Sequence, residues 1–170
     1  AAAAVVAAID KIEAYAGSIT NPAPELADYS TAGITGVTAE NLADVNAAID
    51  AAEATGADTA SEIQGIVDQV IADLAAAAAV DKIEAYAGSN TNPAPELADY
   101  STAGITGVTT ENLADVNAAI DAAEAAGADT ASEIQGIVDQ VIADLAAAAA
   151  VVAAVDKIEA YAGSNTNPAP

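Results

Sequence analysis

The chain repeats itself almost without change at a spacing of 71 residues. Residues 10–80 and 81–151 differ only at three pairs of positions, Ile19/Asn90, Ala39/Thr110 and Thr55/Ala126. A third copy starts at Asp156, and its fifteen residues match residues 81–95. Near-identical units are typical of modular arrays, in which each unit completes its core against its neighbours. An enzyme gains little from a duplicate of its site, so the repeat favours a structural role.

The repeat also has a longer period, because the third copy starts four residues late. Four extra residues follow Val151, and residues 147–155 match residues 1–9 except at the last position. We therefore divide the chain into a segment between repeats, two helical repeats (the second with a four-residue insertion) and the start of a third: residues 1–9, 10–80, 81–155 and 156–170. Four residues are about one helical turn, so an insertion of four rotates the downstream face by only about 40°.

The two ends of the chain have nearly the same sequence. Residues 1–24 match residues 147–170 at all but two positions. We expect the chain to be a window on a longer polymer of repeats, or a protomer whose ends meet its neighbours. The partner predicted on this ground is the chain itself, joined end to end.

Alanine dominates the composition and sets the kind of core that the chain can build. It accounts for 51 of the 170 residues, and it favours helices because it loses no side-chain entropy there. Alanine fills little volume, so the core depends on Ile, Val, Leu and the five tyrosines. A unit of this size buries only about 60% of its unfolded surface, so neighbour contacts should matter.

The charge excludes several classes of partner. The chain has 26 acidic residues, three lysines and no arginine, for a net charge of −23. Nucleic-acid binding depends on Lys and Arg that neutralise phosphates, so we expect no nucleic-acid partner, and an anionic membrane surface is disfavoured for the same reason. The longest apolar run, Leu145–Val155, is shorter than the ~20 residues of a membrane span. A saline exterior, where salt screens the acidic surface, suits this chain.

The pattern of apolar residues predicts an all-α fold. Thr59 and Glu62 form a capping-box sequence, and apolar residues then follow at helical spacing through the repeat boundary to Gly88. This predicts a helix over residues 60–87 that two repeats share. A short helix is predicted from Pro95 to Gly104, and another over residues 110–126, capped by Thr109. The fold class is therefore all-α, with tandem three-helix-type repeats joined by a long shared helix.

No residue pattern predicts catalysis or a cofactor. The acids of the long helix are scattered rather than paired in a cleft: Asp68, Asp73, Asp81 and Glu84. The chain contains no His or Cys, and the ligand spacing of an EF-hand is absent. We predict no enzyme activity and no catalytic, cofactor-binding or metal-binding residue. Asn and Asp in residues 89–92 and 128–129 leave calcium open as a weak possibility.

The lysines and tyrosines recur in every repeat. Lys82 has no acidic residue three or four positions away on its helix, and Lys11 and Lys157 share that context. We expect each lysine to pair with a carboxylate on another helix or unit. We expect the aromatic rings of Tyr86 and Tyr100 to fill gaps among the alanines. The alternative is that they stack on a sugar or a partner.

One segment resembles a known family. The sequence from Leu97 to Ile120, LADYSTAGITGVTTENLADVNAAI, resembles the pattern DYxxAGITGVTxxNLxxVNxAI of helical tandem repeats in giant bacterial surface proteins of the adhesin type. The segments DTASEIQ from Asp129 and KIEAYA from Lys82 resemble its flanks. The resemblance implies an extracellular or cell-surface location, and it transfers no catalytic or binding residue.

Two functions fit these observations. The first is structural, a rod-like spacer or the body of a filament or adhesin. The second is a repeated helical binding module that captures a host protein or glycan, as albumin-binding three-helix modules do. The predicted shared helix favours the first, because independent binding modules are usually joined by flexible linkers.

Overall fold

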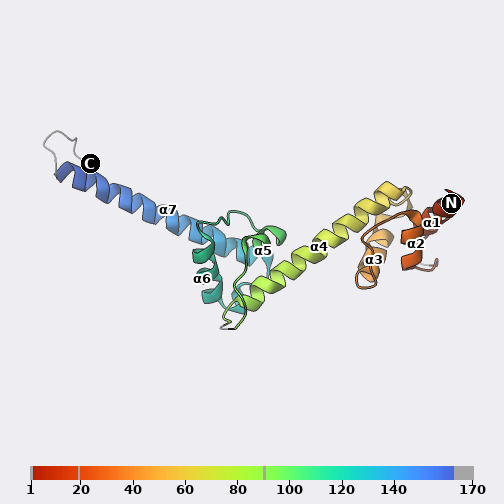
Figure 1. Ribbon diagram of the computed structural model, residues 1–170, viewed down its shortest axis with the longest axis horizontal. Coiled ribbons are helices and arrows are strands. Elements are labelled where there is room, and N and C mark those ends of the chain that lie inside the picture. Colours follow the sequence, from red (N-terminus) through yellow and green to blue (C-terminus); the bar gives the residue numbers. More distant parts are fainter. Residues whose placement is uncertain (1, 19, 90, 163–170) are drawn as a thin grey trace. The chain divides into compact units, whose positions relative to one another are not determined.

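In the part of the chain that the structure describes, alanine-rich segments with apolar stripes form seven α-helices, and two short 3-10 helices lie between them (Figure 1). The structure is a computed structural model that describes residues 2–18, 20–89 and 91–162, and these residues contain no β-strand. The predicted all-α class is therefore confirmed. The chain separates into two compact units, Ala1–Ala75 and Ala76–Pro170. This boundary and the sequence-repeat boundary after Val80 both fall within one helix.

Each unit contains the same order of elements. The first unit holds α1 (Ala2–Tyr15), α2 (Leu26–Ala32), α3 (Leu42–Ala52), the 3-10 helix η1 (Ala54–Gly56) and the start of α4 (Ala60–Tyr86). The second holds the end of α4, then α5 (Leu97–Thr102), α6 (Leu113–Ala123), η2 (Ala125–Gly127) and α7 (Ala131–Ala162). The predicted long helix over 60–87 is confirmed to within one residue.

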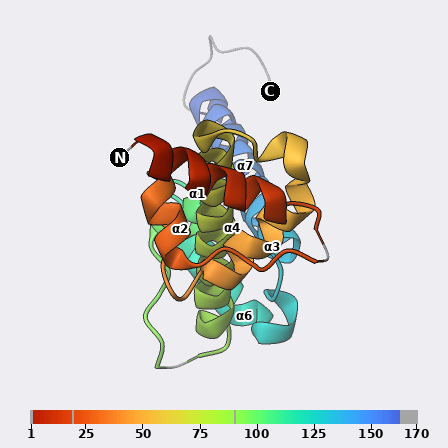
Figure 2. The ribbon, with the colours of Figure 1, turned by 90° about the vertical axis from the view of Figure 1, so that its right-hand side faces the viewer.

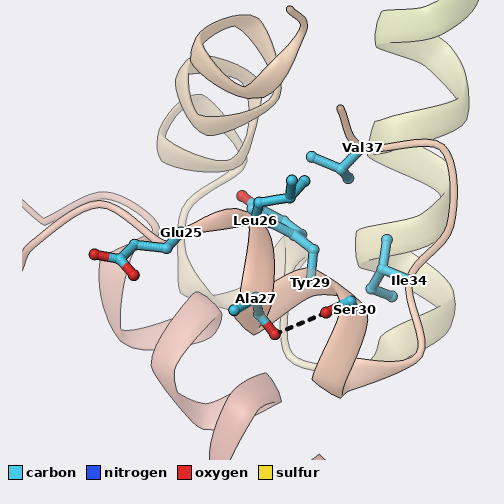
Figure 3. A pocket seen from close by; sticks show the side chains of 7 residues that line it. All are labelled: Glu25, Leu26, Ala27, Tyr29, Ser30, Ile34 and Val37. Carbon is cyan, nitrogen blue, oxygen red and sulfur yellow. Dashed lines mark hydrogen bonds between the residues drawn. The ribbon is translucent and has the colours of Figure 1, made fainter. Parts of the chain in front are cut away.

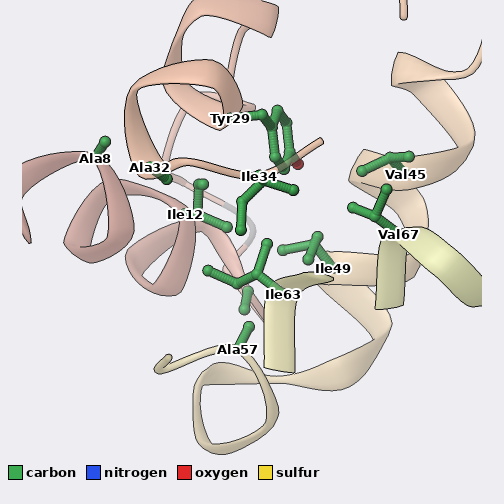
Figure 4. Close-up of a cluster of buried hydrophobic side chains, with 11 residues drawn as sticks. Ala8, Ile12, Tyr29, Ala32, Ile34, Val45, Ile49, Ala57, Ile63 and Val67 are labelled. Carbon is green, nitrogen blue, oxygen red and sulfur yellow. The ribbon is translucent and has the colours of Figure 1, made fainter. Parts of the chain in front are cut away.

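The core of the first unit forms where α1 crosses α4, with α2 and α3 beside the crossing (Figure 2). Six large side chains from these four helices are wholly buried there (Figure 4): Ile12, Tyr29, Val45, Ile49, Ile63 and Val67. The second unit buries the six equivalent side chains: Ile83, Tyr100, Val116, Ile120, Ile134 and Val138. Full burial of one such side chain contributes about 1.5–3 kcal/mol, so these six side chains stabilise each unit substantially.

The N-terminus of α4 is held by the predicted capping box. The Glu62 carboxylate accepts hydrogen bonds from the Thr59 N–H (3.1 Å) and the Thr59 hydroxyl (2.7 Å). The Glu62 N–H in turn lies 3.3 Å from the Thr59 hydroxyl oxygen. The reciprocal bonds satisfy backbone donors that the first helical turn leaves free.

The predicted boundaries of two helices are wrong. The helix expected over 110–126 starts at Leu113, because the Asn112 side chain accepts from the Thr109 N–H (2.7 Å) and donates to the Gly107 carbonyl (2.9 Å), which closes a turn first. It ends at Ala123, where Glu124 turns the chain with a φ of 59°. The short helix expected from Pro95 starts at Leu97, with Glu96 as its N-cap.

Residues 34–37, which follow α2, are held against α4 by hydrogen bonds between Thr35 and Gln64. Gln64 accepts from the Thr35 N–H (2.9 Å) and donates to the Thr35 carbonyl (3.1 Å), as a neighbouring strand would. Gly36 has a φ of +86°, and a Cβ at this position would lie 2.6 Å from Ile71 Cδ1. The positive φ is what favours glycine here, because the close contact is with the flexible end of the exposed Ile71 side chain, which can move aside.

The residue after α3 adopts a backbone conformation that strongly favours glycine. Glu53 has φ 57° and ψ 169°, and Glu124 has φ 59° and ψ 168°. A non-glycine residue held there costs on the order of 1–3 kcal/mol. We expect Glu53→Gly to raise the free energy of unfolding by about 1 kcal/mol, measured by urea denaturation.

Ala47→Gly is the matched control for this substitution. Ala47 is exposed in the interior of α3, where glycine lowers stability by roughly 0.5–1 kcal/mol. If both variants lowered the free energy of unfolding, Glu53 would not be strained.

Candidate functional site

The most distinctive site in each unit is the surface that receives its first helix. In the first unit, α1 and the residue that follows it form a stripe of one large and two small side chains: Ile12 is wholly buried, and Ala8 and Ala16 are 6% and 7% exposed. In the second unit, the end of α4 and the residue that follows it form the same stripe through Ala79, Ile83 and Ala87. Alanines on both sides of a single isoleucine let the helix lie close to its neighbours.

A lysine fastens this first helix to the next one. Lys11 Nζ lies 2.5 Å from Asp28 Oδ2, and Lys82 Nζ lies 2.6 Å from Asp99 Oδ2. The prediction that the lysines pair with a carboxylate on another helix is confirmed for these two. The same Asp28 oxygen accepts the Glu25 N–H at 2.7 Å, so one carboxylate caps α2 and holds α1.

This arrangement shifts the acidity of both aspartates. Partial burial by itself raises the pKa of Asp28, but the hydrogen bonds from Lys11 and from the Glu25 N–H, with the charge of Lys11, outweigh it. The pKa of Asp28 therefore lies below its ordinary value of 3.8, and that of Asp99 does so for the same reasons.

A buried tyrosine joins the same site to α3. The Tyr29 hydroxyl donates to Asn46 Oδ1 at 2.6 Å, and the Asn46 amide donates to the Pro24 carbonyl at 3.0 Å. Burial raises the pKa of Tyr29, and the nearby Tyr15 and Asp28 add to the shift. Its counterpart Tyr100 is also wholly buried, so the ring of Tyr100 packs as core rather than stacking on a ligand.

A backbone hydrogen bond holds the C-terminal end of the first helix in each unit against α3 or α6. The Gly17 N–H donates to the Asp50 carbonyl at 3.0 Å, and the Gly88 N–H donates to the Asp121 carbonyl at 3.1 Å. Three contacts therefore position the first helix in each unit. The stripe sets how closely the helix packs, the lysine–aspartate pair sets its rotation, and the backbone hydrogen bond sets where it ends.

A third copy of the stripe lies at the end of α7 without these contacts. Ile158, equivalent to Ile12 and Ile83, is 53% exposed. Ala154 and Ala162 are exposed as well. Lys157 forms no ion pair within the described part of the chain. The same sequence is therefore buried twice and open once.

The first unit also carries a surface hollow of about 630 Å³ beside α2 (Figure 3). It is lined by Glu25, Leu26, Ala27, Tyr29, Ser30, Ile34 and Val37. The Ser30 hydroxyl donates to the Ala27 carbonyl at 3.0 Å, and the Tyr29 hydroxyl is bound to Asn46. In Figure 3 the Glu25 carboxylate points away from the apolar side chains. The hollow therefore offers apolar surface and few free polar groups.

The scattered acids behave as surface groups. Asp68 and Asp73 are exposed and accept hydrogen bonds from Gln64 (2.8 Å) and Gln69 (2.7 Å), each four residues earlier. Among the described residues no group of three or more acidic side chains could hold a metal ion. The predicted lack of catalytic, cofactor and metal residues, and the weak possibility of calcium, stay predictions.

Within the described residues, two helices are long enough to reach across a membrane. By length and composition, α4 and α7 are apolar enough to cross a membrane, a property that core helices of soluble proteins share. The absence of a membrane span therefore stays a prediction.

Comparisons with models of protein families, with curated proteins and with solved structures found no match. The resemblance to adhesin-type repeats accordingly stays a prediction.

The three lysines allow an internally controlled test of the helix bridges. Lys11→Gln and Lys82→Gln should each lower stability by about 0.2–1 kcal/mol at low salt, as exposed ion pairs do, and the loss should shrink in ~1 M salt. Lys157→Gln should leave the Tm unchanged, because Lys157 has no ion-pair partner in the described residues. Thermal unfolding followed by circular dichroism measures all three. An equal loss in Lys157→Gln would contradict the pairing.

The bridges should also give stability a defined pH dependence. Because the folded pKa of Asp28 and Asp99 lies below 3.8, their contribution is present above about pH 4 and is lost as the pH falls through the lowered pKa. The difference in unfolding free energy between the unmodified chain and Lys11→Gln/Lys82→Gln should therefore shrink as the pH falls below about 4 and approach zero once both aspartates are protonated. A difference that stays constant over this pH range would contradict the claim that the lysine–aspartate pairs stabilise the fold.

Proposed function

We propose that the chain is a structural repeat of an extracellular or cell-surface protein, acting as a rod-like spacer or as the body of a filament or adhesin. The observation that carries the proposal is α4. It is one α-helix from Ala60 to Tyr86, yet Ile63 and Val67 belong to the core of the first unit and Ile83 to that of the second.

A helix with a core at each end supports continuity rather than a flexible joint. The 27 residues of α4 correspond to about 40 Å at ~1.5 Å per residue. Its central residues Ala75, Ala77 and Ala78 are exposed, so that part of the helix is held by its own hydrogen bonds and by the high helix propensity of alanine. The four extra residues of α7 lengthen the same connection by about one turn.

The surface charge supports an extracellular or cell-surface location. A net charge of −23 with three lysines repels other copies of the chain and keeps a repetitive sequence soluble. Salt screens this repulsion, which fits a saline exterior. The resemblance of residues 97–120 to adhesin-type repeats points to the same location.

The hollow beside α2 favours a second candidate, a repeated binding module for a host protein or glycan. Its lining is mostly apolar, which suits an apolar side chain of a protein better than a sugar, whose hydroxyls need polar partners.

Electron microscopy of the purified chain distinguishes the two functions. A spacer should appear as a stiff rod, whereas binding modules should appear as beads on a flexible connection. Ala77→Pro is a sharp control, because it breaks α4 at an exposed position outside both cores. We expect this variant to turn a rod into two hinged beads while each unit stays folded. Flexible beads in the unmodified chain would contradict the spacer function.

A further inference from the structure

The hollow beside α2 is an apolar recess in the surface of the first unit. Its walls come from α2, from the N-cap residue of α2 and from the segment that follows α2. Tyr29 and Ile34 are buried within the lining, whereas Leu26 is 41% exposed. Figure 3 shows Leu26 and Val37 pointing toward one another. A recess with buried apolar walls and an exposed leucine suits an apolar side chain of another molecule.

The apolar surface continues from the hollow onto α4. Val37 follows Gly36, which lies against the end of the Ile71 side chain. Ile71 and Leu74 are both exposed, and they lie three residues apart on one face of the helix. We call the five apolar residues together the α2–α4 surface: Leu26, Ile34, Val37, Ile71 and Leu74.

The charge around this surface selects the sign of a partner. Residues 1–75 contain twelve acidic residues and one lysine, and that lysine is already paired with Asp28. Glu25 lines the hollow, and its carboxylate points away from the apolar side chains (Figure 3). Asp68 is exposed on α4, one turn before Ile71. A complementary partner therefore carries positive charge beside an apolar side chain.

We propose that the α2–α4 surface docks a basic amphipathic segment of another protein. An apolar side chain of the segment fills the hollow, and Lys or Arg side chains beside it pair with Glu25 and Asp68. The inference rests on the second candidate function, the binding module, because it names the class of partner. It is compatible with a spacer, since a rod can carry docking sites along its length.

Other occupants fit this surface less well. A second copy of the chain brings a net charge of −23 to an acidic surface, and anionic lipid headgroups are repelled in the same way. A glycan needs polar partners, but the Tyr29 and Ser30 hydroxyls of the lining are already hydrogen-bonded within the unit. A basic protein segment is favoured both by the apolar recess and by the surrounding charge.

The residues of the surface recur in the second unit. Residues 25–37 and 96–108 have the same sequence, and Ile142 and Leu145 are the exposed counterparts of the two residues on α4. Two equivalent surfaces on one chain would raise the avidity for a partner with repeated basic segments. Both copies must therefore be changed in a test.

Binding of a synthetic peptide to the full chain tests the proposal. The probe is a helix-forming peptide of about 18 residues, with leucine along one face and lysine elsewhere, titrated by calorimetry in about 0.15 M salt. The comparison peptide has glutamine in place of every lysine. We expect the lysine peptide to bind at least about tenfold more tightly than the glutamine peptide.

A charge placed at the hollow separates docking from general attraction to an acidic chain. Leu26→Lys/Leu97→Lys should weaken binding of the lysine peptide at least about tenfold. The matched control, Ala47→Lys/Ala118→Lys, makes the same change in net charge at exposed positions of α3 and α6. It should weaken binding less than about threefold. Circular dichroism verifies that both variants keep the fold.

A second pair of variants tests the acidic edge without touching the apolar lining. Glu25→Gln/Glu96→Gln should weaken binding of the lysine peptide by about threefold and reduce its dependence on salt. Asp10→Asn/Asp81→Asn removes the same charge at exposed positions outside the α2–α4 surface, and it should change both quantities less.

Three results with the peptides would overturn the proposal: no binding, equal affinity for the two peptides, or equal effects of the two lysine variants. Self-association in light scattering, or binding to phosphatidylcholine vesicles, that disappears in Leu26→Lys/Leu97→Lys without any peptide binding would assign the surface to a second copy or to lipid instead. Tight binding of the glutamine peptide would keep the binding module and contradict only the basic partner. The spacer function is tested separately by the stiffness of the chain in the electron microscope.

Discussion

The burial of one isoleucine of the first helix against the other helices of a unit is the interaction on which this structure depends. Ile12 and Ile83 are both wholly buried, and each arrives on a helix that lies N-terminal to the rest of its unit. The remaining helices are short, seven and eleven residues for α2 and α3, and isolated helices of this length are marginal in water. A unit therefore needs a helix brought to it from the N-terminal side.

The polar contacts specify where that helix sits. Alanine-rich faces are nearly featureless, and a helix packed on them could slide or rotate at little cost. The Lys11–Asp28 bridge and the bond from the Gly17 N–H to the Asp50 carbonyl each fix one point along α1. Tyr29 and Asn46 fix the relation of α2 to α3 from within the core. Hydrophobic burial thus supplies the stability, and a few hydrogen bonds supply the register.

The parts of the fold that could be predicted from the sequence are those set by local patterns. The capping box at Thr59 and the apolar spacing of α4 involve neighbours in sequence, and the long helix was placed to within one residue. The lysine pairs were expected because no helical neighbour could satisfy Lys82. Other features could not be predicted from local patterns. The hydrogen bonds of Gln64 and the positive φ of Glu53 depend on tertiary contacts. The late start of α6 reflects a turn that competes with a strong local signal for a helix start. Asn112 closes a turn where Thr109 looked like a cap, and Gln64 reaches a residue 29 positions away.

Hydrogen exchange of two identical peptides within one molecule tests this account most directly. Residues 81–87 and 156–162 have the same sequence and therefore the same intrinsic exchange rates. The first lies in the core of the second unit, and the second lies on the exposed end of α7. We predict strong protection of the amides in 81–87 and much faster exchange in 156–162, measured by mass spectrometry on the unmodified chain. Equal protection of the two peptides, whether high or low, would contradict the claim that docking of the first helix holds each unit together.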